Sequence, residues 1–206
     1  MSQIALPFEW PADEHERDFI LSEANSQVAR HLDHWSLWPV MATIITGPRK
    51  SGRSLIGRLF ARKTGGELID NAERAGEEML FHAWNRAQER HRPLLIIADA
   101  PPPVWRVRLP DLRSRLSATP HVAIAEPDDA LAAALIEKLL VARGLVPPPD
   151  LARYLVPRIE RSYIGINRIV DAIDEIALSR RHRITLPLAR QALAKLGVID
   201  DSSFPR

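Results

Sequence analysis

A glycine-rich loop between an apolar run and an amphipathic stretch contains the residues best suited to chemistry in this chain. Residues 41–46 read Met-Ala-Thr-Ile-Ile-Thr, residues 47–54 read Gly-Pro-Arg-Lys-Ser-Gly-Arg-Ser, and Leu55, Leu59 and Phe60 follow at helical spacing. A strand, a glycine-rich turn and a helix in this order bind phosphate, because backbone N–H groups and the helix N-terminus point at it. The sequence therefore predicts a phosphate-binding loop. The alternative is an ordinary strand–turn–helix unit with two glycines.

One position departs from the phosphate-loop pattern G-x-x-x-x-G-K-[ST]. Gly47, Gly52 and Ser54 fit it, and Arg53 stands where the phosphate-binding lysine belongs. Arginine keeps the positive charge and can bind phosphate oxygens bidentately, but its planar fork is larger than an ammonium group and is directed differently. We therefore expect the loop to be compatible with nucleotide binding and poorly suited to hydrolysis. Lys50 stands where a further glycine is common and where a positive φ can be required.

Length and composition indicate a globular protein of one large or two small domains. The 206 residues are 46% hydrophobic and 26% charged, which is enough for a substantial core. No apolar run has membrane-spanning length, and Gln3 and Glu9 are foreign to a signal peptide, so a cytoplasmic protein is expected. The absence of cysteine excludes disulfides and thiolate metal sites. The net charge of +2 argues against a large DNA-binding face.

The N-terminal tail contains a candidate anchor for a partner protein. It reads Gln-Ile-Ala-Leu-Pro-Phe from Gln3 to Phe8, and Pro7 favours an extended backbone. The Gln3 amide can hydrogen-bond in a small polar pocket while Leu6 and Phe8 fill an apolar groove. The segment resembles the peptide by which bacterial proteins bind the DNA polymerase sliding clamp. The alternative is a tail that folds back onto its own domain.

Two apolar segments after the loop are predicted to be strands that end in aspartate. Residues 67–69 precede Asp70 and Asn71, and residues 94–98 precede Asp99. An acid after a strand beside a phosphate loop can hold Mg²⁺, whereas Asn71 cannot act as the base that a second acid would supply. A helix cap is the alternative role for Asp70-Asn71. Asp99 ends a continuous apolar strand, where α/β sheets place ligands.

Helices are predicted for most of the remaining chain. We expect one over residues 72–90, one that Asp111 caps, and only helices from Pro127 onward. His31 and His34 lie three residues apart on a helix before the loop. No third ligand is evident, so we expect both to face solvent rather than to bind a metal.

The order of these motifs resembles the DnaA-type AAA+ proteins. After the loop come Ile69-Asp70-Asn71, the strand that ends in Asp99, and Leu-Pro-Asp-Leu-Arg-Ser-Arg-Leu over residues 109–116. With the N-terminal hexapeptide in front, the chain is similar to the Hda family of regulatory DnaA homologues from residue 3 to about residue 197. The fold implied is an α/β, parallel AAA+ sheet flanked by helices, plus a small all-helical lid domain. The short linker before Glu67 predicts that this sheet lacks one strand.

The resemblance implies three segments. Residues 1–10 are the extended clamp-binding tail, residues 11–126 the nucleotide-binding α/β core, and residues 127–206 the lid. DnaA-type initiators have a further helix-turn-helix domain, and we expect none here, so no direct sequence-specific DNA binding is expected. The expected partners are the sliding clamp and DnaA. The oligomeric state is left open, a homodimer included.

The resemblance also assigns roles to single residues. Arg115 is the arginine finger, Asp99 the sensor 1 residue and Asp70 the Walker B acid, while the sensor 2 arginine falls on Ile164. An isoleucine cannot contact a γ-phosphate, and the arginines at 161 and 168 are the nearby candidates to compensate. The expected nucleotide contacts are Gly47, Pro48, Lys50, Gly52, Arg53, Ser54, Asp70 and Asp99, with Ser54 and Asp70 as ligands of Mg²⁺. The expected clamp contacts are Gln3, Ile4, Leu6, Pro7 and Phe8.

The implied function follows from an asymmetry. Groups that would hydrolyse the chain's own nucleotide are altered at Arg53, Asn71 and Ile164, whereas Arg115 is intact. We expect an inefficient ATPase. Its loop holds an adenine nucleotide, with ADP as the first candidate, or holds no nucleotide. Tethered to the clamp near the nucleoid, it would stimulate hydrolysis of DnaA-bound ATP and so prevent re-initiation of replication. The alternatives are an active P-loop ATPase that serves as a remodeller or loader, and an adaptor without effect on hydrolysis.

Overall fold

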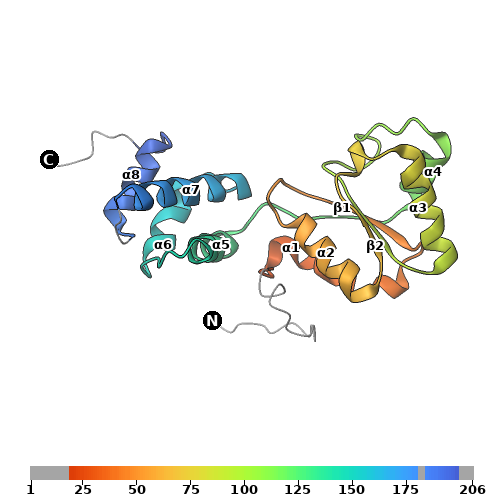
Figure 1. The fold of residues 1–206 in the computed structure, drawn as a ribbon, viewed down its shortest axis with the longest axis horizontal. Helices are drawn as coiled ribbons and strands as arrows, with labels where there is room; N and C mark the ends of the chain where they lie inside the picture. Colours follow the sequence, from red (N-terminus) through yellow and green to blue (C-terminus); the bar gives the residue numbers. More distant parts are fainter. Residues whose placement is uncertain (1–18, 181–183, 200–206) are drawn as a thin grey trace.

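A four-stranded parallel sheet forms the centre of the N-terminal unit (Figure 1). The structure is a computed structural model that describes residues 19–180 and 184–199, without the side chains of residues 179 and 180. The strand order is β2-β3-β1-β4, and every pairing is parallel. The strands are β1 (Ala42–Thr46), β2 (Glu67–Ile69), β3 (Leu94–Ile97) and β4 (His121–Ala123).

Helices cover both faces of this sheet. Alternate residues of a strand point to opposite faces, and the two apolar clusters of the core follow that rule. Ile44 and Ile96 pack on the face of α3 and α4, while Ile45 and Leu95 pack on the face of α1 and α2. The helical segments are α1 (Glu23–Asp33), η2 (Trp35–Leu37), α2 (Arg53–Thr64), η3 (Ala72–Arg74), α3 (Glu77–Arg90) and α4 (Pro110–Ala118).

In the described chain, no strand lies between α2 and β2, because the connection is too short to hold one. Helix α2 ends at Thr64, Gly65 turns the backbone at a φ of 66°, and β2 begins at Glu67. A parallel crossover between two further strands needs a dozen or more residues. The predicted α/β class is therefore confirmed, with four strands in the described part of the chain.

Two predictions about helix boundaries are wrong. Helix α4 begins at Pro110 with Leu109 as its N-cap, so Asp111 lies inside the first turn. Proline is favoured there because it lacks the N–H that a first turn leaves unpaired. The region 72–90 is two helical segments rather than one, since Ala75 is extended.

His31 is half-buried, so the prediction that it faces solvent is wrong. Its Nε2 shares a hydrogen bond of 2.8 Å with Thr43 Oγ1, and its ring stacks on Trp38 with centroids 4.9 Å apart. Burial of the ring lowers the pKa of His31. His34 is exposed, as predicted. No group of three metal-ligating side chains occurs among the described residues.

The C-terminal unit is helical and has its own apolar core. It comprises α5 (Asp129–Ala142), α6 (Leu151–Leu155), η4 (Val156–Arg158), α7 (Tyr163–Arg180) and α8 (Leu186–Lys195). The Asp128 carboxylate and the Thr185 hydroxyl cap α5 and α8 by accepting backbone N–H bonds. Among the helices described, none combines the length and apolarity that crossing a membrane requires.

Tyr163 joins this helical unit to the α/β core. Its hydroxyl donates to the Ala125 carbonyl at 3.1 Å, and its ring packs in the apolar cluster of α1 and α2. Burial raises the pKa of Tyr163 to about 12. The first turn of α7 is therefore held against the end of β4.

Candidate functional site

The loop between β1 and α2 has the backbone conformation of an anion-binding loop. Gly47, Lys50 and Gly52 all have positive φ, at 146°, 68° and 89°. Lys50 thus has the positive φ that its position in the loop can require. A Cβ on Gly47 would lie 2.8 Å from the carbonyl oxygen of Ile124, so only glycine lets this loop pass beside the end of β4.

The start of α2 presents backbone donors without a side-chain cap. Its N-cap is Gly52, and the first helical hydrogen bond runs from the Ile56 N–H to the Gly52 carbonyl. The preceding N–H groups of the first turn have no helical acceptor, and the helix dipole adds positive potential there. The buried Ser51 hydroxyl also has no hydrogen-bond partner among the described residues. A phosphate group suits this arrangement of donors.

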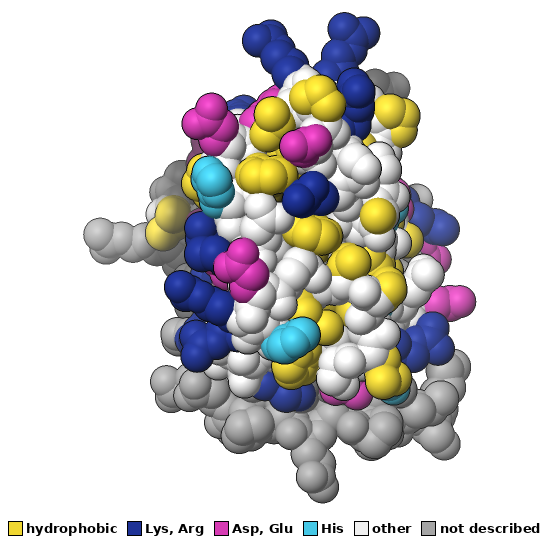
Figure 2. All heavy atoms as spheres, turned by 90° about the vertical axis from the view of Figure 1, so that its right-hand side faces the viewer, with side chains coloured by type: hydrophobic (Ala, Val, Ile, Leu, Met, Phe, Trp, Pro, Cys, Tyr) yellow, Lys and Arg dark blue, Asp and Glu magenta, His cyan; other side chains and the backbone are white. Residues whose placement is uncertain are grey.

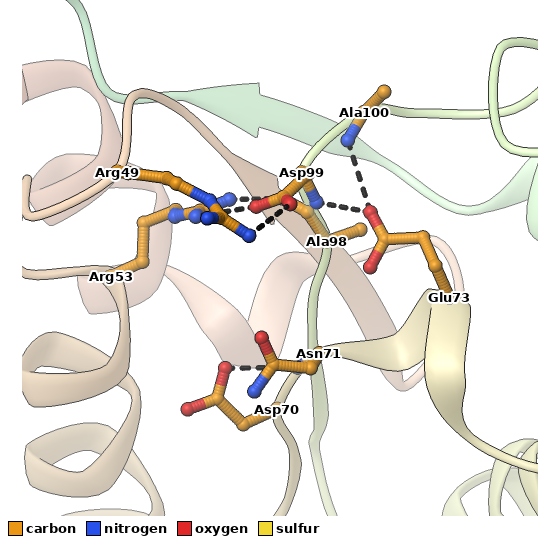
Figure 3. Close-up of polar contacts among 8 residues, drawn as sticks. All are labelled: Arg49, Arg53, Asp70, Asn71, Glu73, Ala98, Asp99 and Ala100. Atoms are coloured by element: carbon orange, nitrogen blue, oxygen red, sulfur yellow. Dashed lines mark hydrogen bonds and ion pairs between the residues drawn. The ribbon is translucent and has the colours of Figure 1, made fainter.

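Arg53 reaches the carboxyl end of β3 instead of the loop (Figure 3). Its Nη2 donates to Asp99 Oδ1 at 2.8 Å, and its Nη1 donates to the Ala98 carbonyl. The Arg53 side chain is 12% exposed. Arg49 approaches the same carboxylate, with Nη2 3.6 Å from Oδ2. The hydrogen bond from Arg53 is the main cause of a lowered pKa for Asp99.

Two acids of the segment that leads into α3 hold the loop between β3 and α4. The Glu73 carboxylate accepts from the backbone N–H groups of Asp99 and Ala100. The Glu77 carboxylate accepts from Arg108 N at 2.9 Å and Leu109 N at 2.7 Å. The bonds to Glu77 lower its pKa. Sequence reasoning missed both acids, because the N–H groups that they bind lie 26 to 32 residues further along the chain and no local pattern marks them.

Asp70 and Asn71 lie apart from the Arg53–Asp99 pair, beyond the end of β2 (Figure 3). Asp70 Oδ1 accepts from the Asn71 N–H at 2.9 Å, and Asn71 has a φ of 53°. Asp70 Oδ2 has no partner among the described residues. Carboxylate and hydroxyl oxygens are ligands that Mg²⁺ accepts, so Asp70 and Ser54 fit that ion chemically.

Arg115 lies on the surface that α3 and α4 form. Its Nε donates to Asn85 Oδ1 at 3.0 Å, and its guanidinium lies 4.6 Å from the ring centroid of Phe81 and 5.3 Å from that of Trp84. Neither Nη atom has an acceptor within the described ranges. Figure 2 views the end of the molecule that carries these helices, where hydrophobic and charged side chains are interspersed.

The remaining predicted site residues are dispersed. Ile164 is 40% exposed at the start of α7. Arg161 pairs with Asp129 at 2.9 Å, and Arg168 is exposed on α7. The predicted clamp contacts, Gln3, Ile4, Leu6, Pro7 and Phe8, lie outside the described residues.

Solved structures share this fold. Domain III of the replication initiation protein DnaA from Thermotoga maritima is 13% identical with a TM-score of 0.70, covering 87% of this chain and 95% of that chain. AMPPCP-bound DnaA from Aquifex aeolicus is 16% identical with a TM-score of 0.59, covering 80% of this chain and 67% of that one. The RuvB Holliday junction branch migration motor from Thermotoga maritima is 13% identical with a TM-score of 0.63, covering 93% and 74%.

The helical unit has a more specific match. Residues 128–193 match the family model described as Hda, lid domain. These residues run from the N-cap of α5 into α8. Residues 128–193 are therefore similar to the Hda lid domain, and the chain as a whole shares the fold of DnaA domain III.

Proposed function

We propose that this chain regulates DNA replication by stimulating the hydrolysis of ATP bound to DnaA, with Arg115 acting in trans. The observation that carries the proposal is the contrast between two guanidinium groups. Arg53 is committed to Asp99 in its own site, whereas Arg115 lies on the α3–α4 surface with its Nη atoms unbonded among the described residues. An arginine supplied in trans stabilises charge on the transferred γ-phosphoryl group and contributes ~10³–10⁵ in rate in analogous systems.

The setting of Arg115 supports this role. Stacking on Phe81 and the bond from Nε to Asn85 hold the guanidinium plane of the partly exposed Arg115, and the described residues give its Nη atoms no acceptor. A guanidinium held in this way loses less side-chain entropy when it meets a phosphate. In this proposal, the α3–α4 surface contacts DnaA and the chain's own site turns over slowly, since Asn71 provides no base.

The chain's own loop binds an adenine nucleotide in this proposal, ADP above all. The uncapped first turn of α2 and the backbone conformation of residues 47–52 support phosphate binding. The AMPPCP in the similar Aquifex aeolicus DnaA is an adenine nucleotide analogue and supports the same class of ligand. The phosphates supply negative charge for Mg²⁺, which Ser54 and Asp70 would hold.

The N-terminal segment, residues 1–10, anchors the chain to the sliding clamp. Gln3, Leu6 and Phe8 are the contacts that the sequence pattern supports. Tethering can raise the local concentration of the chain to about the millimolar range, so weak contacts with DnaA suffice. In this proposal, residues 11–126 form the nucleotide-binding core and residues 127–206 form the lid. The protein acts in the cytoplasm.

Reconstitution tests the proposal. ATP-loaded DnaA is mixed with clamp-loaded DNA and this chain, and phosphate release is followed. Arg115→Ala should lower the stimulated rate at least ~10²-fold, with clamp binding unchanged. Arg113→Ala is the matched control, because Arg113 is an exposed arginine of the same helix. Full stimulation by Arg115→Ala contradicts the finger role, and equal losses in both variants indicate a general effect of surface charge on α4.

A further inference from the structure

We propose that Asp99 is an internal counter-ion that holds Arg53 away from phosphate, so that nucleotide binding requires exchange of this ion pair. The proposal deepens the nucleotide-binding part of the proposed function, and it concerns the affinity of the chain's own site. In the loop pattern, the residue at position 53 supplies the cation for the phosphates. Here that cation is already occupied by two acceptors, the Asp99 carboxylate and the Ala98 carbonyl.

The position of Asp99 is fixed by the backbone around it. Ala98 is the residue after β3, and its N–H donates to the Ile45 carbonyl of β1 at 3.1 Å. The N–H groups of Asp99 and Ala100 are both held by Glu73 (Figure 3). The carboxylate therefore stands on a short segment that is bonded on both sides. Arg53 meets a pre-positioned acceptor, which keeps the entropy cost of the pair low.

Burial distinguishes Arg53 from the other cations of the loop. The Arg53 side chain is 12% exposed, whereas that of Arg49 is 67% exposed. Lys50 is also exposed. An arriving phosphate can therefore reach Lys50 directly and Arg49 past a long, exposed contact with Asp99 of 3.6 Å, whereas for the buried Arg53 it must displace a hydrogen bond of 2.8 Å. A charge-assisted hydrogen bond is about twice as strong as a neutral one, so the competition should cost about tenfold in affinity.

A double-mutant cycle with ADP as the probe tests this role. The full-length chain, freed of bound nucleotide, is compared with Asp99→Asn, Arg53→Gln and the double variant by calorimetric titration. Asp99→Asn preserves the shape of the side chain and removes its charge. It should bind ADP about tenfold more tightly than the unaltered chain. In the Arg53→Gln background the same change should alter affinity less than about twofold, since the buried guanidinium is gone and only the exposed Arg49 remains beside Asp99.

The controls separate this account from simpler ones. Asp111→Asn removes an exposed carboxylate from the start of α4 and should leave ADP affinity unchanged. An equal gain from Asp99→Asn in both backgrounds would identify plain repulsion between Asp99 and the phosphates, and it would overturn the proposal. Unchanged, weaker or undetectable ADP binding by Asp99→Asn would overturn it as well. No DnaA is present in these titrations, so their failure leaves the role of Arg115 in trans untouched.

Discussion

At the scale of single residues, the loop depends on backbone conformations that few side chains accept. Gly47 has a φ of 146° and faces the end of β4, and Lys50 adopts a positive φ although it carries a side chain. Such conformations cost of order 1–3 kcal/mol and persist only where the surroundings enforce them. The strained loop is thus part of the candidate phosphate site rather than a free surface turn.

Substituting Gly47 tests how tightly β4 confines the loop. Gly47→Ala should lower the free energy of unfolding by about 2 kcal/mol or more, because a Cβ would overlap Ile124 and the backbone is left-handed. Gly65→Ala is the control, since Gly65 has a φ of 66° and nothing lies within 4 Å of its added Cβ. It should cost only about 1 kcal/mol. Urea unfolding of both variants gives the comparison, and equal losses would refute the overlap.

His31 should make stability depend on pH. Burial lowers its pKa in the folded chain, so the unfolded chain binds its proton more readily. The stability that neutral His31 provides is present above the unfolded pKa of about 6.5 and is lost as pH falls below it. Stability of His31→Gln should therefore decline less than that of the unaltered chain between about pH 7.5 and 5.5. Thermal unfolding over this range measures it, with the exposed His82→Gln as control; parallel curves for His31→Gln and the unaltered chain would contradict it.

At the scale of elements, the two acids before and at the start of α3 connect the sheet to the helix that carries Arg115. Glu73 holds the chain as it leaves β3, and Glu77 holds it as it enters α4. The intervening residues 101–107 include three consecutive prolines, which limit their backbone further. Helix α3 therefore positions α4 through two sets of contacts on one of its faces. These are the Glu77 carboxylate and the side chains that Arg115 contacts.

Loss of the Glu77 contact should loosen this connection. In Glu77→Gln, an NH₂ group replaces one of the two acceptor oxygens and the negative charge is lost, so the bonds from the N–H groups of Arg108 and Leu109 should weaken. Hydrogen exchange at Arg108 and Leu109 should become faster, while exchange in β1 and β3 stays unchanged. Glu78→Gln is the matched control, because Glu78 is an exposed acid next to Glu77. Identical exchange in the two variants would show that Glu77 does not hold the loop.

At the scale of the whole molecule, the α/β core holds two arginines in chemically different settings. Arg53 faces inward, to the end of β3, and Arg115 lies on the outer surface of α3 and α4. The helical lid meets the core at Tyr163, beside the end of β4. This arrangement leaves the α3–α4 surface clear of Tyr163, as the proposed contact with DnaA requires.

Local sequence patterns predicted most helices and strands, but they could not predict contacts between residues far apart in the sequence. The buried strands β1 and β3 and the glycine-rich loop after β1 follow from neighbouring residues. The Arg53–Asp99 pair joins residues 46 positions apart, so its formation depends on how β3 packs beside β1. His31 was misplaced for the same reason, because its partner Thr43 belongs to β1 rather than to the helix.

The most direct measurement of the central claim is single-turnover hydrolysis of ATP preloaded on DnaA, as a function of the concentration of this chain. Only nucleotide bound to DnaA is then counted, and the maximal rate separates from the half-saturating concentration. With Arg115→Ala, the maximal rate should fall at least ~10²-fold while the half-saturating concentration changes little. An unchanged maximal rate with a raised half-saturating concentration would contradict the account, since Arg115 would then only help the two proteins to bind.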